Sequence, residues 1–213
     1  MKVVIFGATG IVGKSILKEA LAHKHQVTVL TRDASKISIK DNNLSVVEGN
    51  ISDRKTVSNI LQNQDAVIQA IGIGGKGDGK PTTFVSDTNK LIMEEMQNNN
   101  VKRLIAMSVI GAGNSIAFMP WIFTKVMIPY FMKWFQSIID DKNRMEPMIM
   151  NSGFDWTIIR GTTVVDKPAK NKITATLDGE GIKFSITSAD MATFVVKQLT
   201  DKTFLKQAPT VSN

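Results

Sequence analysis

The chain has 213 residues, of which 43% are hydrophobic and 21% are charged, and it contains no cysteine. This composition predicts one soluble globular domain, and it excludes a disulfide scaffold, a thiolate metal site and a disordered chain. The net charge of +7 comes from lysines and arginines scattered along the sequence, so we expect no nucleic-acid partner, whereas an anionic small ligand suits the same positive field.

Short apolar runs alternate with helix-length segments from the start of the chain. Met1 leads directly into the first run without a signal-peptide pattern, which favours a cytoplasmic protein. The runs are too short for helices and predict strands buried on both faces, at 3–6, 27–30, 66–71, 104–107 and 156–159. The segments between them predict helices at 11–23, 52–61, 84–98 and in a stretch that ends near Asn151. This alternation predicts an α/β protein with a doubly wound, mainly parallel sheet.

The last part of the chain carries a looser group of elements. We expect strands at 172–177, 183–186 and 210–212 and a helix at 188–199. We therefore predict a single domain over residues 1–213, to which residues from about 155 onward contribute a small substrate-side region.

Glycines follow the first strand in the stretch GATGIVG at 7–13. Gly7 lets the chain turn off the strand, Gly10 lets a pyrophosphate approach the backbone, and Gly13 lets the next helix pack closely. A tight turn alone would also explain them, but the strand before and the helix after are typical of the Rossmann dinucleotide-binding fold, whose helix N-terminus attracts anions. We assign cofactor contacts to Gly7, Thr9, Gly10, Ile11, Val12 and Gly13.

The second strand ends at the position where an acidic side chain holds the ribose of NAD. Arg32 stands there instead, and Lys36 follows one helical turn later. Two cations suit the 2′-phosphate of NADP, so we predict that NADP(H) is preferred over NAD(H). The alternative is a solvated arginine beside Asp33.

Several further motifs extend the pattern over nearly the whole chain. They are VTVLTRD at 27–33, VVEGNISD at 46–53, QDAVIQAIG at 64–72, VKRLIAMS at 101–108, DDKNRMEPMIMNSGFDWTIIRG at 140–161 and TLDGEGIKFSITSADMATFVVKQL at 176–199. With them the chain resembles the atypical short-chain dehydrogenase/reductases, in the NAD(P)H-binding group of NmrA-like proteins and flavin reductase/biliverdin reductase B enzymes. The resemblance implies that Asn50 and Ile51 flank the adenine and that Ser108 faces the nicotinamide. It also implies a ribose lining made of Ala70, Ile71 and Gly72.

Catalytic members of the wider superfamily use a Tyr-x-x-x-Lys pair. Lys142 falls at the lysine position, but Ile138 occupies the tyrosine position, and the only tyrosine, Tyr130, is out of register. The resemblance therefore leaves Ser108 and Lys142 as candidate catalytic residues. Without a phenol acid, a flavin, quinone or tetrapyrrole acceptor is favoured over a ketone, or else no chemistry takes place. Thr163 stands where biliverdin reductase B enzymes tend to carry histidine, which argues against that specific activity.

Half of the aromatic residues lie within 116–139. Prolines and lysines interrupt this segment, so we expect no transmembrane helix. The segment predicts an apolar wall on which a flavin stacks over the nicotinamide, an oligomer interface or ordinary core cover. We expect a monomer or a homodimer.

Three other sequence patterns give weaker indications of function. The stretch GGKGDGKPT at 74–82 resembles a phosphate-binding loop, but Pro81 replaces the magnesium-binding hydroxyl, so we expect a mobile flap or a surface loop. Asp140 and Asp141 are interpreted as first-turn carboxylates that complement a helix dipole. His23 and His25 have no third ligand nearby, so we expect no metal.

The leading hypothesis is an NADPH-dependent oxidoreductase of flavin-reductase type, with a planar acceptor as the second substrate. The alternative is a non-catalytic, NmrA-like protein that senses NADP(H) and acts through a protein partner. Both functions need the same glycine turn, and the missing tyrosine fits either.

Overall fold

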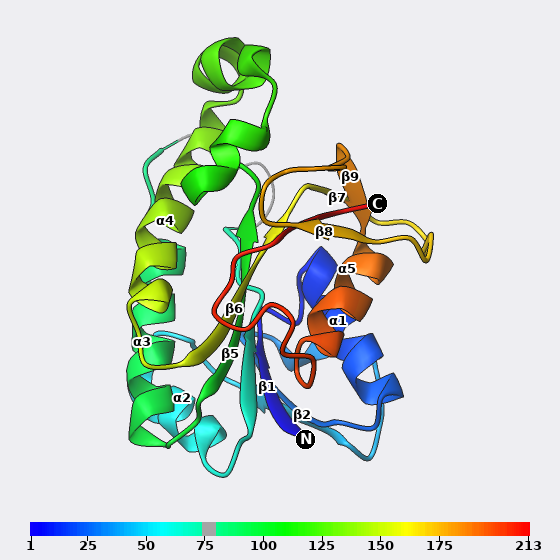
Figure 1. Cartoon of the computed structure of the whole chain (residues 1–213). Helices are drawn as coiled ribbons and strands as arrows, with labels where there is room; N and C mark the ends of the chain where they lie inside the picture. Colours follow the sequence, from blue (N-terminus) through cyan, green and yellow to red (C-terminus); the bar gives the residue numbers. More distant parts are fainter. Residues whose placement is uncertain (74–79) are drawn as a thin grey trace.

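The computed structural model describes residues 1–73 and 80–213. The main sheet of this described part contains eight strands, β1 (Lys2–Phe6), β2 (Gln26–Thr31), β3 (Leu44–Glu48), β4 (Ala66–Gln69), β5 (Arg103–Val109), β6 (Asp155–Gly161), β8 (Thr174–Thr176) and β10 (Thr210–Ser212). Their order in space is β3-β2-β1-β4-β5-β6-β10-β8 (Figure 1). Only β8 runs antiparallel to its neighbour. The predicted doubly wound, mainly parallel α/β fold is confirmed.

Both faces of the sheet are covered by helices, which explains the continuous apolar runs of its central strands. Along β1, Val3 and Ile5 enter one apolar cluster, while Val4 and Phe6 enter the cluster on the opposite face. Helices α1 (Ile11–Ala22) and α5 (Ser188–Lys197) cover the first face, and α2 (Arg54–Leu61), α3 (Phe84–Asn98) and α4 (Lys133–Met150) cover the second (Figure 1).

The strand order reverses direction at β1. The chain moves outward through β2 and β3 and then returns to place β4 on the other side of β1. In this register Ile5 lies between Val29 and Ile68. Open α/β sheets bind ligands outside the carboxyl ends of the strands at such a switch point, so the turns after β1 and β4 border the expected crevice.

Two strands were absent from the sequence prediction. Strand β3 lies at an edge of the sheet, and its residues are exposed or half-buried, so it lacks the continuous apolar run of a central strand. Strand β7 (Thr163–Val165) is short and pairs with β9 (Ser185–Thr187) in a separate two-stranded parallel sheet. Such short or exposed strands are specified mainly by their neighbours.

The connection between β5 and α4 projects beyond the end of the sheet (Figure 1). It contains a 3₁₀ helix, η2 (Gly113–Phe118), and a π-helix, η3 (Phe123–Phe131). Helix α4 then continues through Pro147, which lies in its last turn and does not interrupt it. Within 1–73 and 80–213, no helix is both long and apolar enough to cross a membrane. Most of the glycine-rich stretch predicted to be a flap, 74–79, falls outside the described residues.

Candidate functional site

The glycine turn lies at the crevice, between the end of β1 and the start of α1. Gly7 has a φ of +86°, and a Cβ added to it would lie 2.5 Å from the carbonyl oxygen of Ala70. A Cβ on Gly13 would lie 2.0 Å from the carbonyl oxygen of Gly7. The backbone of the protein itself therefore forbids a side chain at both positions.

Gly10 has no such neighbour. It is exposed, its φ is −74°, and an added Cβ would meet only the Gly7 carbonyl oxygen, at 3.5 Å. Gly10 caps α1 without a side-chain hydrogen bond, and the first turn carries no acidic residue, so no side chain within residues 1–73 and 80–213 accepts from the first N–H groups of the helix. This bare backbone beside unpaired donors fits the diphosphate of a dinucleotide.

The residues that flank Gly10 in the turn are exposed or half-buried. Ile11 is 61% exposed although it is apolar, and Thr9 and Val12 are half-buried. An exposed isoleucine at a helix N-terminus is consistent with a ligand-contact surface, and its role stays a prediction.

A cationic pair follows the neighbouring strand β2. Arg32 is exposed and makes no ion pair within the described part of the chain, whereas Lys36 lies 3.7 Å from the carboxylate of Asp33. Asp33 accepts hydrogen bonds from the hydroxyl and the backbone N–H of Ser35. The Ser35 hydroxyl is the main cause that lowers the pKa of Asp33, so this carboxylate stays charged beside the two cations.

The remaining predicted cofactor contacts lie at the same edge of the sheet. Asn50 follows β3, is exposed, and accepts a hydrogen bond from the backbone of Ser52, while Ile51 is half-buried beside it. Ala70, Ile71 and Gly72 follow β4, and the Ala70 N–H donates to the Phe6 carbonyl. The structure thus brings the residues predicted to contact the adenine and the ribose to the carboxyl ends of β3 and β4, with β2 and β1 between them.

Lys142 is buried in α4, with 3% of its surface exposed. Its ammonium donates to the carbonyl oxygens of Met107, at 2.7 Å, and Ile71, at 3.4 Å, and so ties together the ends of β5 and β4. Burial lowers the pKa of Lys142 to about 8, against the opposing effect of the Asp141 and Glu146 carboxylates. A buried amine that changes charge near neutral pH is suited to proton transfer.

Ser108 lies near the end of β5, and its hydroxyl points into a buried ionic network. The Ser108 hydroxyl donates to Glu146 Oε1 at 2.6 Å, and Arg160 holds both carboxylate oxygens of Glu146 through Nε at 3.1 Å and Nη2 at 2.7 Å. Arg160 also donates to Asn114 at 2.6 Å. Because its own proton is committed to Glu146, Ser108 can offer only oxygen lone pairs to a ligand.

Glu146 and Arg160 are the site-adjacent residues that sequence reasoning missed. A signal was available, because Glu146 stands four residues after Lys142 on one face of a helix, and Arg160 is a charged residue directly after Ile158 and Ile159 in a strand that is buried from Trp156 onward. Both residues are at most 2% exposed, and a buried charge needs a partner.

The prediction for Asp140 and Asp141 was wrong in one respect. Helix α4 begins at Lys133, so neither residue lies in its first turn. Asp141 is buried and accepts hydrogen bonds from the backbone N–H groups of Val85, at 2.9 Å, and Ser86, at 3.1 Å, at the start of α3. It complements a helix dipole, but that of the neighbouring helix, because α4 packs along α3.

The aromatic segment is largely exposed in the structure. Trp121, Tyr130 and Phe131 are each more than 70% exposed, and the Phe123 ring lies 6.0 Å from that of Phe184. This ring pair joins η3 to the loop before β9. Whether the exposed rings contact an acceptor or another protein stays a prediction.

The described residues contain no group of three or more potential metal ligands. His23 ends α1 and is exposed, and His25 lies 3.3 Å from the N-terminal amine. Thr163 lies in β7 and is exposed, and Ile138, at the position of the missing tyrosine, is half-buried in α4.

Comparison with known proteins identifies the family. A family model described as NAD(P)H-binding matches residues 7–202. The photosystem II assembly factor Ycf39 of Synechocystis is 27% identical over 162 residues, which are 75% of this chain, and the match spans only 44% of that relative.

Solved structures show the same fold. The anaerobilin reductase ChuY of Escherichia coli O157:H7 has a TM-score of 0.80 at 19% identity, with 100% of this chain and 97% of that chain covered. A short-chain dehydrogenase/reductase of Veillonella parvula, solved in complex with NADP, has a TM-score of 0.77 at 18% identity, with 100% and 94% covered.

Proposed function

Because this chain belongs to the NAD(P)H-binding family, we propose that it is an NADPH-dependent oxidoreductase that transfers hydride from the nicotinamide to a flavin or a similar planar acceptor. The observation that carries the proposal is Gly10, whose missing side chain is required by no contact among the described residues, beside the N–H groups of α1 that have no side-chain acceptor in the same part of the chain. A dinucleotide diphosphate at this turn would place the rest of the cofactor along the ends of β4 and β5.

Bound NADPH would supply the hydride, and the chain would orient the cofactor and the acceptor. Ser108, held by Glu146, presents an acceptor oxygen that is suited to the amino group of the nicotinamide carboxamide. Lys142 fixes the backbone carbonyls of Ile71 and Met107 and holds a proton on a buried amine. The position that would carry a phenol acid is Ile138, so the acceptor has to draw its proton from water or from Lys142.

An acceptor ring that can be protonated at nitrogen meets this requirement, and a flavin is one. The exposed rings of Trp121, Tyr130 and Phe131 lie on the connection between β5 and α4 and offer apolar surface for a planar molecule. The likeness in fold to an anaerobilin reductase supports an extended conjugated acceptor, and the NADP complex of another structure of this fold supports the cofactor.

Anaerobic mixing of the protein with NADPH and FMN or FAD tests the proposal through the loss of flavin absorbance. We expect turnover that falls at least tenfold in Ser108→Ala. The control is Ser45→Ala, an exposed serine of the edge strand β3, which follows η1 (Ala34–Lys36) in the chain; this variant should leave the rate unchanged. A rate at background with flavins, quinones and biliverdin alike would overturn the proposal.

The second candidate is a regulatory protein that binds NADP(H) without turnover and acts through a protein partner. The absence of a tyrosine at Ile138 favours it, and so does the match to a relative described as an assembly factor. This candidate predicts tight NADPH binding together with no reduction of any acceptor in the same experiment.

A further inference from the structure

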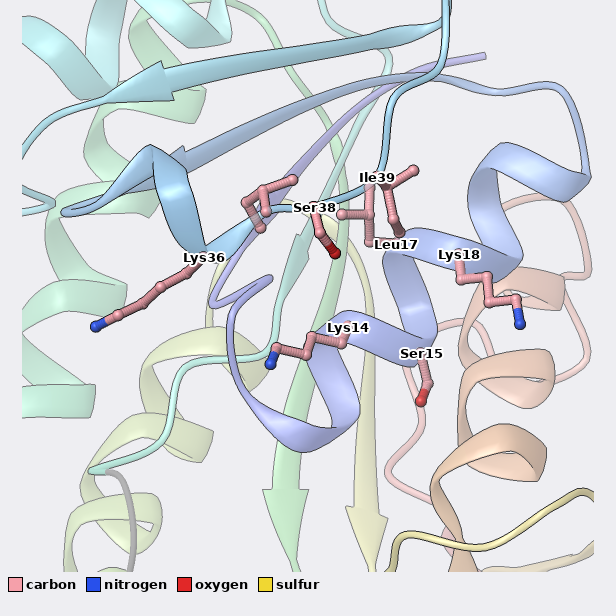
Figure 2. A pocket seen from close by; sticks show the side chains of 8 residues that line it. Lys14, Ser15, Leu17, Lys18, Lys36, Ser38 and Ile39 are labelled. Atoms are coloured by element: carbon pink, nitrogen blue, oxygen red, sulfur yellow. The ribbon is translucent and has the colours of Figure 1, made fainter.

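A groove opens between the outer side of α1 and the segment that follows η1 (Figure 2). Its volume is about 250 Å³, and it is lined by Lys14, Ser15, Leu17, Lys18, Lys36, Ile37, Ser38 and Ile39. None of these residues is acidic, so the groove has a basic rim over an apolar floor.

The positive charges of Arg32 and Lys36, which we assign to the 2′-phosphate, do not neutralise the charge of this group. Arg32 and Lys36 bring two positive charges, but Asp33 is ion-paired with Lys36 at 3.7 Å and removes one of them. A phosphate monoester carries about −1.5 to −2 at pH 7. A further cation at this position would bring the local positive charge closer in magnitude to the charge of a 2′-phosphate.

Lys14 lines the same groove as Lys36 and can supply such a cation from the α1 side. It belongs to the first turns of α1, and its backbone N–H donates to the carbonyl oxygen of Gly10 at 2.9 Å. Its side chain is exposed and makes no ion pair within residues 1–73 and 80–213. In Figure 2 the Lys14 side chain extends toward the glycine turn and the side of the groove from which Lys36 emerges, whereas Lys18, one turn later, lies at the opposite end.

We propose that Lys14 is a specificity-determining residue for NADP(H), which closes the 2′-phosphate position from the α1 side while Arg32 and Lys36 close it from the β2 side. This inference rests on the proposed function for the identity of the ligand. It adds that discrimination against NAD(H) comes from two elements, the first helix as well as the turn after the second strand.

The test compares 2′,5′-ADP with 5′-AMP by calorimetry, because the two ligands differ only in the 2′-phosphate. We expect Lys14→Gln to weaken 2′,5′-ADP binding about fivefold to tenfold and to leave 5′-AMP binding unchanged. The matched control Lys18→Gln removes the same charge from the same helix and groove, and it should leave the affinity ratio of the two ligands unchanged. Circular dichroism verifies that both variants fold.

An unchanged ratio in Lys14→Gln, or an equal fall of the ratio in both variants, would overturn the inference, since the second result would show only a general effect of positive charge. A wild-type protein without preference for 2′,5′-ADP would overturn it too. The binding assay requires no turnover, so a failure of flavin reduction, which would overturn the proposed function, is seen separately.

Discussion

Gly10 differs from Gly7 and Gly13 in the reason for its missing side chain. The two outer glycines are required by backbone atoms of the protein, at 2.5 Å and 2.0 Å from an added Cβ, whereas Gly10 has only one ordinary contact, at 3.5 Å. We therefore expect stability and ligand binding to depend on different glycines of one motif.

This difference can be measured with two alanine variants. Gly10→Ala should change the free energy of unfolding by less than about 1 kcal/mol, because alanine adopts its φ freely, while NADPH affinity falls at least tenfold. Gly13→Ala should destabilise the protein by about 1 to 3 kcal/mol. Urea unfolding and a fluorescence titration with NADPH give both quantities. Wild-type NADPH affinity in Gly10→Ala would contradict the assignment.

Lys142 makes stability depend on pH at the alkaline end. Its pKa is lowered from 10.5 to about 8 in the folded protein, so between these values the unfolded chain binds more protons than the folded one. Stability contributed by this residue must therefore rise as the pH rises from about 8 to 10.5. The cause is burial, which penalises the ammonium and not the neutral amine.

Lys142→Met removes this dependence. Between pH 8 and 10.5 the stability of the wild type relative to the variant should increase, by at most about 1.4 kcal/mol per pH unit. Urea unfolding of both proteins across this range gives the difference, in which the other lysines cancel. Parallel curves would show that Lys142 keeps an ordinary pKa when folded.

At the scale of elements, α4 organises the site by holding its neighbours. Asp141 binds the N-terminus of α3, Lys142 binds the ends of β4 and β5, and Glu146 binds Ser108 of β5 and Arg160 of β6. These three residues lie within two turns of α4. The placement of this one helix therefore determines how the ends of several strands are held.

The contact between α4 and α3 is open to a direct test. Asp141→Ala should cost about 1 to 3 kcal/mol of stability, since two buried N–H groups lose their acceptor. Hydrogen exchange should accelerate at the amides of Val85 and Ser86 more than elsewhere. Asp140→Ala, its exposed neighbour, serves as the control and should stay within about 0.5 kcal/mol of the wild type. Unchanged exchange at both amides would exclude the cap.

At the scale of the whole molecule, the proposed cofactor position crosses the switch point and contacts the turns after several strands. A ligand that binds only the folded state stabilises it by mass action, by about 2.7 kcal/mol at a concentration 100-fold above Kd. The bound cofactor should therefore stabilise the folded protein through contacts along the carboxyl edge of the sheet.

Thermal unfolding with each dinucleotide checks this expectation. NADPH at 100-fold above its Kd should raise the Tm by roughly 5 to 10 °C. NADH at the same concentration should raise it less, because it lacks the phosphate that Arg32 and Lys36 are proposed to bind. An equal or larger shift with NADH would contradict the predicted preference for NADPH.

The sequence by itself determined the fold class, the central strands and the position of the glycine turn. Apolar runs mark strands buried on both faces, and the spacing of Gly7, Gly10 and Gly13 marks a turn in which the positive φ of Gly7 and the contact of Gly13 with the Gly7 carbonyl are local demands. These features were predictable because each depends on residues close together in the chain. The family match over residues 7–202 agrees with them.

Only the tertiary structure decided how the polar groups pair. The edge strand β3 and the short β7 lack an apolar signal, and the sequence assigned Asp141 to its own helix although it caps α3. The network of Ser108, Glu146 and Arg160 joins residues from β5, α4 and β6. A buried charge pairs with whichever partner packing brings near. Local sequence patterns do not predict how elements distant in the chain pack against one another.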